Sequence, residues 1–250
     1  MRNLTIYTAA SGDYLNYLPL WIYSVKKSYP TCNASYDTFS SPRSQYYAAC
    51  FRLLTEIHDT DFVYINDADI IMLKEEPTLF EFHTAQMKED DLCYSNSPRT
   101  SEYLGDKRLT GLHFCNQEWY KETRDIRVKY LHMLESGEIG NGRFDDELTL
   151  MKVAKQSGLK IPPPRKPLTA RHHGIHLGTL RAYRNHSRGR INQQLRIRIS
   201  PAQAKQYLQY YDDANFQVVL QKVCKRSRAI KWELETLYAF CRRAEKEVVE

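Results

Sequence analysis

Hydrophobic and polar residues switch repeatedly between a strand period and a helix period along the first 160 positions of the chain. Short β-prone runs predict strands over residues 4–9, 62–65, 92–95 and 112–115. Apolar side chains three and four positions apart predict helices over residues 18–25 and 44–58. Alternating strands and helices are typical of an α/β domain, in which helices cover a mixed or mostly parallel sheet.

The pattern after residue 200 is helical throughout. Ile230, Leu234, Leu237 and Cys241 recur at the spacing of one helix face. We therefore predict an α/β domain over residues 1–200 and a C-terminal helical appendage over residues 201–250.

The composition fits a globular α/β protein. The chain has 250 residues and a hydrophobic content of 42%, which is enough for a sizeable core. No run approaches the roughly 18 apolar residues that span a bilayer, and the first residues lack the apolar core of a signal peptide. Six scattered cysteines contain no Cys-x-x-Cys pair, so we expect reduced core thiols. These features predict a soluble, cytoplasmic protein.

The net charge of +6 is unevenly distributed, because residues 181–200 contain six arginines and no acid. Such a stretch suits phosphates, an acidic glycan or an anionic lipid surface. An alternative is a solvated loop and edge strand, since residues 195–199 alternate between apolar and basic side chains. No recognisable nucleic-acid-binding motif accompanies the charge, so no nucleic-acid partner is predicted.

Two aspartates, Asp67 and Asp69, follow the apolar run over residues 62–65. The end of a buried strand is where open α/β sheets place their ligands, and an extended backbone directs side chains two positions apart the same way. Two carboxylates at such a place suit Mg²⁺ or Mn²⁺. The alternative is a solvated surface turn, which the apolar residues 70–73 disfavour.

Three histidines and two glycines lie together late in the chain, at His172, His173, Gly174, His176 and Gly178. Glycine lets a ligand approach the backbone closely, and a neutral imidazole can complete a metal shell that the aspartates begin. His176 or His173 is therefore a predicted metal ligand. The alternative for each histidine is a structural role in the core.

An acidic triplet, Asp145, Asp146 and Glu147, precedes the helical spacing of residues 148–154. Acidic residues at this place cap a helix and complement its dipole. One carboxylate could instead face a cleft as a general base, for which Asp145 or Asp146 is the candidate. A cap residue at the rim of a cleft can serve both roles.

Taken in order, these motifs resemble nucleotide-sugar glycosyltransferases of the GT-A fold. Residues 66–69 (Asn-Asp-Ala-Asp) are similar to the metal motif of that fold, and residues 8–10 (Thr-Ala-Ala) look like its nucleotide-binding loop. The late histidine segment is similar to that of glycosyltransferase family 8, in which a histidine joins the two aspartates on Mn²⁺. The resemblance covers residues 3–180 and implies a GT-A-like (Rossmann-like) mixed central sheet flanked by helices.

The resemblance implies metal-dependent transfer of a sugar from a nucleotide-diphosphate donor, with UDP-sugars favoured, to a hydroxyl of a glycan or lipid-linked acceptor. Mn²⁺ or Mg²⁺ would be bound by Asp67, Asp69 and His176, and Asp145 or Asp146 would be the base of an inverting enzyme. No Lys-Pro-Trp follows Gly178, so Arg181 or Arg171 is expected to replace the family's phosphate-contacting lysine.

The residues expected at the donor are Thr8, Ala9, Ala10, Arg52, Asn66, Asp67, Ala68, Asp69, His176, Gly178 and Arg181. Those expected along the donor sugar or the acceptor are Thr110, Gly111, His113 and Asn116.

Two other functions share part of this pattern. A haloacid-dehalogenase-like phosphatase also carries Asp-x-Asp at a strand end, with the first aspartate as nucleophile, but usually on its first strand. A non-catalytic carbohydrate-binding protein could keep the fold alone. Turnover of a generic phosphate ester without a nucleotide sugar would identify the phosphatase.

Basic side chains flank the apolar stripe of the C-terminal helices, at Lys222, Lys225, Arg226, Arg228, Lys231, Arg242 and Arg243. Such a surface could make a peripheral contact with an anionic membrane that carries a lipid-linked acceptor. The alternative is that the stripe packs against the catalytic domain or a second subunit of a homodimer.

Overall fold

The computed structural model describes residues 3–40, 44, 46–100, 107–164, 173–180 and 199–246. Contacts divide the chain into two compact units, each of which contains discontinuous segments. Unit 1 consists of Met1–Leu15, Thr31–Ala68 and Glu76–Arg171, and unit 2 of Asn16–Pro30, Asp69–Glu75 and His172–Glu250.

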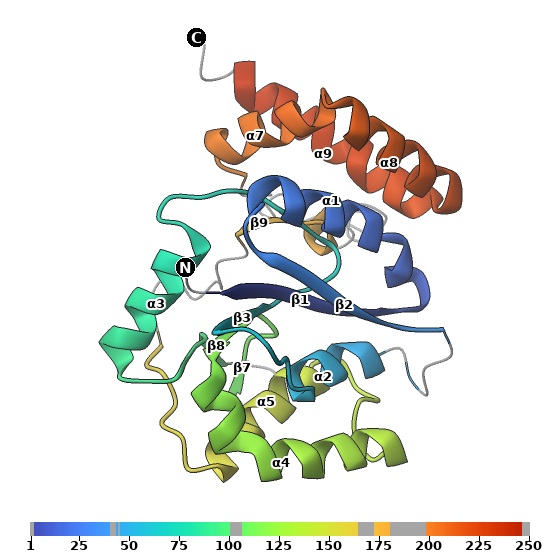
Figure 1. Ribbon diagram of the computed structural model, residues 1–250. Coiled ribbons are helices and arrows are strands. Elements are labelled where there is room, and N and C mark those ends of the chain that lie inside the picture. Colours follow the sequence, from blue (N-terminus) through green and yellow to red (C-terminus); the bar gives the residue numbers. More distant parts are fainter. Residues whose placement is uncertain are drawn as a thin grey trace. The chain divides into compact units, whose positions relative to one another are not determined.

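Unit 1 is built on a five-stranded sheet with the order β2-β1-β3-β8-β5 (Figure 1). The strand β1 (Leu4–Ser11) is parallel to β2 (Asn33–Phe39) and to β3 (Phe62–Ile65). The strand β8 (His113–Asn116) is antiparallel to β3 and to β5 (Tyr94–Ser95). All eight residues of β1 are buried. The predicted mixed α/β sheet is therefore confirmed.

Three helices of unit 1 pack against one another on one face of this sheet, as Figure 1 shows. They are α2 (Tyr47–Leu54), α4 (Gln117–Ser136) and α5 (Asp145–Gln156), while α3 (Leu79–Asp90) contacts β5. The last residue of β8, Asn116, caps α4 by accepting the backbone N–H groups of the second and third helical residues.

A separate antiparallel pair of strands, β6 (Pro98–Thr100) and β7 (Lys107–Leu109), also belongs to unit 1. Its register places Arg99 directly opposite Arg108, and β7 packs against α5. Two arginines at directly opposite positions are unfavourable unless an anion lies between them. A carboxylate or another anionic group beside Arg99 and Arg108 would therefore stabilise this pair of strands.

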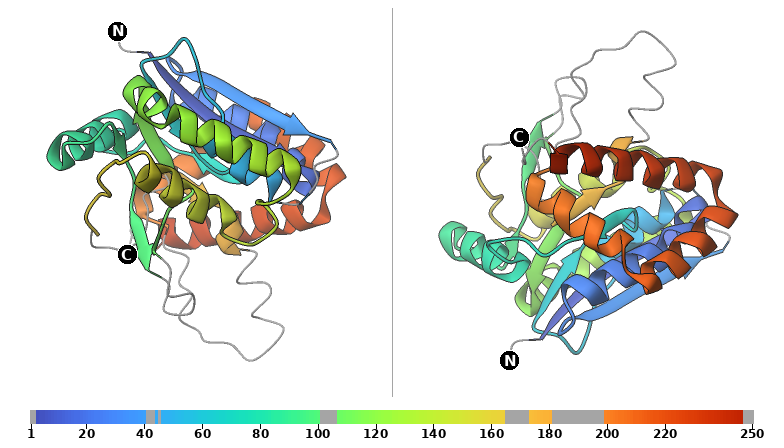
Figure 2. Two further views of the ribbon diagram at one scale, coloured as in Figure 1. Left: turned by 90° about the horizontal axis from the view of Figure 1, so that it is seen from below. Right: turned by 90° about the horizontal axis from the view of Figure 1, so that it is seen from above.

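Unit 2 consists of helices around a small two-stranded sheet. The elements are α1 (Leu18–Ser28), β4 (Ile70–Met72), β9 (Gly174–His176), α7 (Pro201–Tyr211), α8 (Ala214–Arg226) and α9 (Arg228–Lys246). Helices α7 and α9 lie side by side (Figures 1 and 2). The predicted apolar stripe of α9 is buried in the core of this unit.

Helix α1 fixes the position of β4 through serine side chains. Ser24 Oγ accepts a hydrogen bond from Met72 N (3.0 Å), and Ser28 Oγ donates to Met72 O (2.8 Å). Because β4 begins directly after Asp69, these bonds also fix the backbone next to that carboxylate.

The sequence pattern missed the longest helix of unit 1, α4, and the exposed strand β2. In the middle of α4 two of the buried positions are taken by Thr123 and Arg127, whose polar side chains break the apolar period. The predicted domain boundary after residue 200 stays a prediction. None of the described helices is long and apolar enough to cross a membrane.

Candidate functional site

The backbone at the end of β3 is held by its neighbours. Asn66 N donates to Tyr7 O (3.0 Å), which continues the pairing of β3 with β1. Asn66 O accepts hydrogen bonds from Thr8 Oγ1 (2.8 Å) and Arg52 Nη1 (2.7 Å). The next residue, Asp67, places its Oδ1 2.5 Å from the same Arg52 Nη1. A strand end and a helix thus position one guanidinium against the first aspartate of the motif.

The guanidinium of Arg52 lies between two carboxylates. Its side chain is 3% exposed, and its Nη2 is 3.6 Å from Asp146 Oδ2 at the start of α5. Burial raises the pKa of Asp146, the charge of Arg52 lowers it and the charge of Asp67 raises it. Gly111 leaves room for this pair, because a Cβ there would be 2.9 Å from Arg52 Nη2 and 3.1 Å from Asp146 Oδ2.

The preceding residue, Asp145, has different partners. Its Oδ2 accepts the backbone N–H groups of Gly140 (3.1 Å), Asn141 (2.9 Å) and Gly142 (2.8 Å). Three such bonds give this carboxylate a structural role in the loop before α5. The third acid, Glu147, contacts arginines of the β6–β7 pair. The three acids of the predicted triplet therefore point to three different sets of partners.

A cavity of about 650 Å³ lies within unit 1, between the end of β1 and the start of α2. It is lined by Ala9, Ala10, Ser11, Gly12, Asp13, Tyr14, Ser44, Tyr46, Ala48, Ala49, Arg52, Asp67 and Ala68. Parallel strands β1 and β3 both end at it, which is the place where open α/β sheets bind small molecules.

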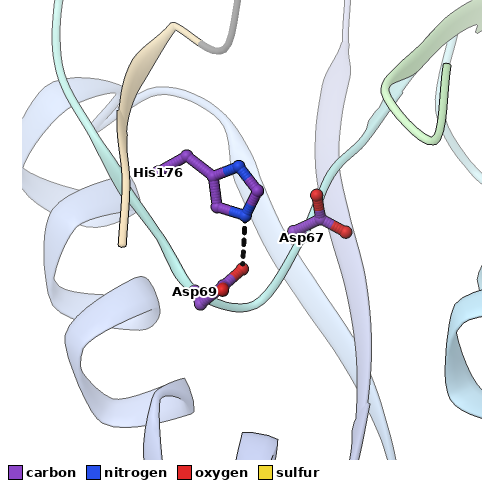
Figure 3. Close-up of side chains that lie close together, drawn as sticks. All are labelled: Asp67, Asp69 and His176. Atoms are coloured by element: carbon purple, nitrogen blue, oxygen red, sulfur yellow. Dashed lines mark ion pairs between the residues drawn. The ribbon is translucent and has the colours of Figure 1, made fainter. Parts of the chain in front are cut away.

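The second aspartate, Asp69, lies in unit 2 beside the late histidine segment. The antiparallel register pairs Ile70 with His176, and Leu177 N donates to Asp69 O (2.9 Å). His176 Nε2 is 3.2 Å from Asp69 Oδ1, as the dashed line in Figure 3 marks. Gly174 permits this pairing, since a Cβ there would collide with the carbonyl oxygen of Ile71.

Asp67, Asp69 and His176 make a possible metal site among the described residues (Figure 3). One residue separates the two aspartates, so covalent geometry alone keeps their Cα atoms within about 7 Å. His176 in turn is held on Asp69 by the pairing of β9 with β4. Two carboxylates and one imidazole suit Mn²⁺, and also Mg²⁺ with additional water ligands.

Of the other predicted histidines, those that the structure describes do not belong to this group. His173 is fully buried, with Nδ1 3.6 Å from Glu75 Oε2, and His172 lies outside the described residues. His113 packs between Tyr94 and Trp119, and burial lowers its pKa to about 3, so its imidazole is neutral. Neither His113 nor Asn116 lines the cavity of unit 1, and Asn116 caps α4, so their expected place along the substrate stays a prediction.

The predicted donor-binding residues divide into groups. Those lining the cavity are Ala9, Ala10, Arg52, Asp67 and Ala68. Thr8 and Asn66 are fully buried, and Thr8 Oγ1 donates a hydrogen bond to Asn66 O after the end of β3. Gly178 follows His176 in unit 2, and Arg171 and Arg181 lie outside the described residues.

Sequence reasoning missed much of the cavity lining. Ala48 and Ala49 precede Arg52 by four and three positions in α2, and they therefore share its helix face. Small residues one turn before a buried arginine were the available signal. Tyr14 and Tyr46 gave no such signal, because neither belongs to a periodic pattern.

Comparisons with known proteins give limited similarity. No protein family model and no curated protein sequence matches the chain. The solved structures that are similar to this chain include two of the glycosyltransferase GlyE from Streptococcus pneumoniae TIGR4. The apo form has 11% identity and a TM-score of 0.39, and the other structure has 13% and 0.40. Each match covers 63% of this chain but only 44% of the GlyE chain. The function proposed below therefore rests on the site residues.

Proposed function

We propose that the protein is a metal-dependent glycosyltransferase that moves a sugar from a nucleotide-diphosphate donor to an acceptor hydroxyl. The observation that carries the proposal is the cavity at the ends of β1 and β3, which contains Arg52 and Asp67. It combines a fixed cation for phosphate oxygens with the first carboxylate of a metal motif. A UDP-sugar is the favoured donor, and the acceptor is a glycan or a lipid-linked sugar.

Arg52 would bind the diphosphate of the donor. A guanidinium is always charged, and its planar N–H groups match phosphate oxygens. Asn66 O and two carboxylates already hold this side chain, so little conformational entropy would be lost when it meets the donor. The cavity volume of about 650 Å³ is in the range of small-molecule sites.

Asp67, Asp69 and His176 would hold a divalent cation. When bound, such a cation offsets the negative charge that develops on a departing diphosphate. The side chain of Asp69 is 1% exposed and that of His176 is 25% exposed, so water has little access to the carboxylate. Low exposure favours a bound cation as the partner of this acid.

Asp146 would be the general base if the reaction inverts the anomeric carbon. The acceptor oxygen forms a bond to that carbon, the bond to the diphosphate oxygen breaks, and the acceptor proton passes to the carboxylate. A pKa raised by burial makes Asp146 a better proton acceptor than an ordinary surface aspartate. Asp145 is a weaker candidate, because its Oδ2 already accepts three backbone N–H groups. A retaining reaction would not need this base.

The test is a thermal-shift screen of the full chain with nucleotide sugars, in the presence and absence of Mn²⁺. We expect one donor to raise the melting temperature only when Mn²⁺ is present, and Asp67→Asn to remove that shift. The matched control is Asp125→Asn, which removes an exposed carboxylate from α4.

Two outcomes would overturn the proposal. Turnover of a generic phosphate ester without any nucleotide sugar would identify a phosphatase. Metal-dependent donor binding without hydrolysis or transfer of any sugar would identify a non-catalytic carbohydrate-binding protein. Membrane contact and homodimer formation through the C-terminal helices stay predictions.

A further inference from the structure

A second group of charges lies one residue beyond the proposed base. Glu147 of α5 contacts both arginines of the β6–β7 pair, and its side chain is 10% exposed. Its Oε1 is 3.2 Å from Arg99 Nη1, and its Oε2 accepts a hydrogen bond from Arg108 Nε. This single carboxylate lies between two cations that the strand register places opposite each other.

A third arginine joins the group through an aromatic ring. The guanidinium carbon of Arg108 is 4.1 Å from the centre of the Phe144 ring, and that of Arg143 is 4.8 Å from the same centre. Cations near the face of a ring are stabilised by its quadrupole, which does not neutralise their charge. Arg143 is exposed and forms no ion pair among the described residues.

Two of these three arginines therefore share the carboxylate of Glu147, and Arg143 contacts only the Phe144 ring among the described residues. Arg108 is only 9% exposed, and its Nη1 makes no hydrogen bond within the described part of the chain. A buried guanidinium N–H without an acceptor is costly, so an acceptor from outside would be favoured. Arg99 has a side chain that is 31% exposed, which leaves the group accessible to a ligand.

We propose that Arg99, Arg108 and Arg143 form an anion-binding subsite that takes the phosphate or carboxylate of an acidic sugar acceptor. This inference rests on the proposed function, because it assigns the group to the acceptor. Glu147 directly follows Asp146 on α5, so the carboxylate that the arginines contact is the chain neighbour of the proposed base. Arginine forks bind both phosphate and carboxylate oxygens, and a neutral sugar offers neither.

The test is calorimetric titration of the full chain with glucose 6-phosphate, glucuronate and glucose. We expect at least one charged sugar to bind at least about tenfold more tightly than glucose, because only charged groups gain from the arginines. Arg143→Gln and Arg99→Gln should each lower the affinity for the charged sugar about threefold to tenfold and leave the affinity for glucose unchanged. Arg124→Gln, which removes an exposed arginine from α4, is the matched control.

Arg143→Gln is the decisive variant, because Arg143 is exposed and its loss leaves both contacts of Glu147 in place. Equal binding of charged and neutral sugars, or an equal effect of Arg143→Gln and Arg124→Gln, would overturn the inference. Displacement of the charged sugar by UDP would assign the subsite to the donor and would also overturn it. Binding that UDP does not displace would support the inference. The charged sugar that then binds more tightly, glucose 6-phosphate or glucuronate, would identify the acidic group of the acceptor as a phosphate or a carboxylate.

Donor hydrolysis measured without any acceptor separates this inference from the proposed function. If charged sugars bind as expected but no nucleotide sugar is hydrolysed or transferred, the glycosyltransferase proposal fails while the anion site stands. If a donor is hydrolysed in a metal-dependent way but charged sugars bind no better than glucose, only the subsite fails.

Discussion

The two aspartates of one motif have different surroundings, although one residue separates them. Asp67 belongs to unit 1, is 30% exposed and lies against the guanidinium of Arg52. Asp69 belongs to unit 2, is 1% exposed and lies against the imidazole of His176. The first is therefore positioned by the end of β3 and by Arg52 of α2, and the second by the pairing of β4 with β9. Each half of the motif is thus held by elements of its own unit.

The largest expected effect is that of Asp69→Ala. Loss of a buried ligand should abolish Mn²⁺ binding and lower kcat/KM with the best donor by about 100-fold or more, because a metal contributes several kcal/mol to the stabilisation of the transition state. Manganese binding is measured by electron paramagnetic resonance, and transfer by release of the nucleoside diphosphate. Asp125→Asn should change neither. Full manganese binding by Asp69→Ala would show that this half of the motif is structural.

Arg52→Lys tests the other half and should have the next largest effect. Lysine keeps the charge but loses the planar fork, so donor affinity should fall about tenfold. The matched control is Arg127→Lys, since Arg127 is equally buried but donates to Leu54 O and Tyr120 O inside the unit. Each change should lower the free energy of unfolding by about 1–3 kcal/mol. Donor affinity should respond only at position 52, and an equal response at both would indicate a purely structural Arg52.

A smaller effect is expected from Gly111→Ala. The added methyl would meet Arg52 Nη2 and Asp146 Oδ2 at 2.9 and 3.1 Å, so the guanidinium must shift. We expect a cost of about 1–3 kcal/mol in the free energy of unfolding and a few-fold weaker donor binding. Urea denaturation and calorimetry measure the two effects. In the Arg52→Lys background the same change should weaken donor binding less, because the shifted group is already altered.

The sequence predicted the Asp67 half of the site better than its surroundings. An apolar run that ends in carboxylates is a local signal, and so is the strand–helix alternation around it. The contact of Arg52 with Asp146 depends on packing between α2 and α5, which lie far apart in the chain. No local pattern reports such a contact.

The histidine next to Asp69 could not be identified from a local sequence pattern either. His172, His173 and His176 look alike in sequence, and only the register of β9 against β4 identifies His176 as the neighbour of Asp69. A shift by one residue would exchange the faces of the strand. The roles of Asp145 and Asp146 likewise separate only when their partners are known.

The smallest effect concerns the acid that shares Arg52 with Asp67. Burial raises the folded-state pKa of Asp146 above 3.8, so above that pH the unfolded chain releases this proton before the folded chain does. The stability contribution of the group is therefore complete below pH 3.8 and is lost as the pH rises through the raised pKa. Asparagine does not titrate, so the stability of Asp146→Asn relative to the unaltered protein should increase from about pH 4 towards neutrality and then level off. Urea denaturation in EDTA measures this difference. For Asp125→Asn the difference in stability from the unaltered protein should stay nearly constant with pH. If the relative stability of Asp146→Asn instead falls as the pH rises, Arg52 stabilises the ionised carboxylate more than burial destabilises it.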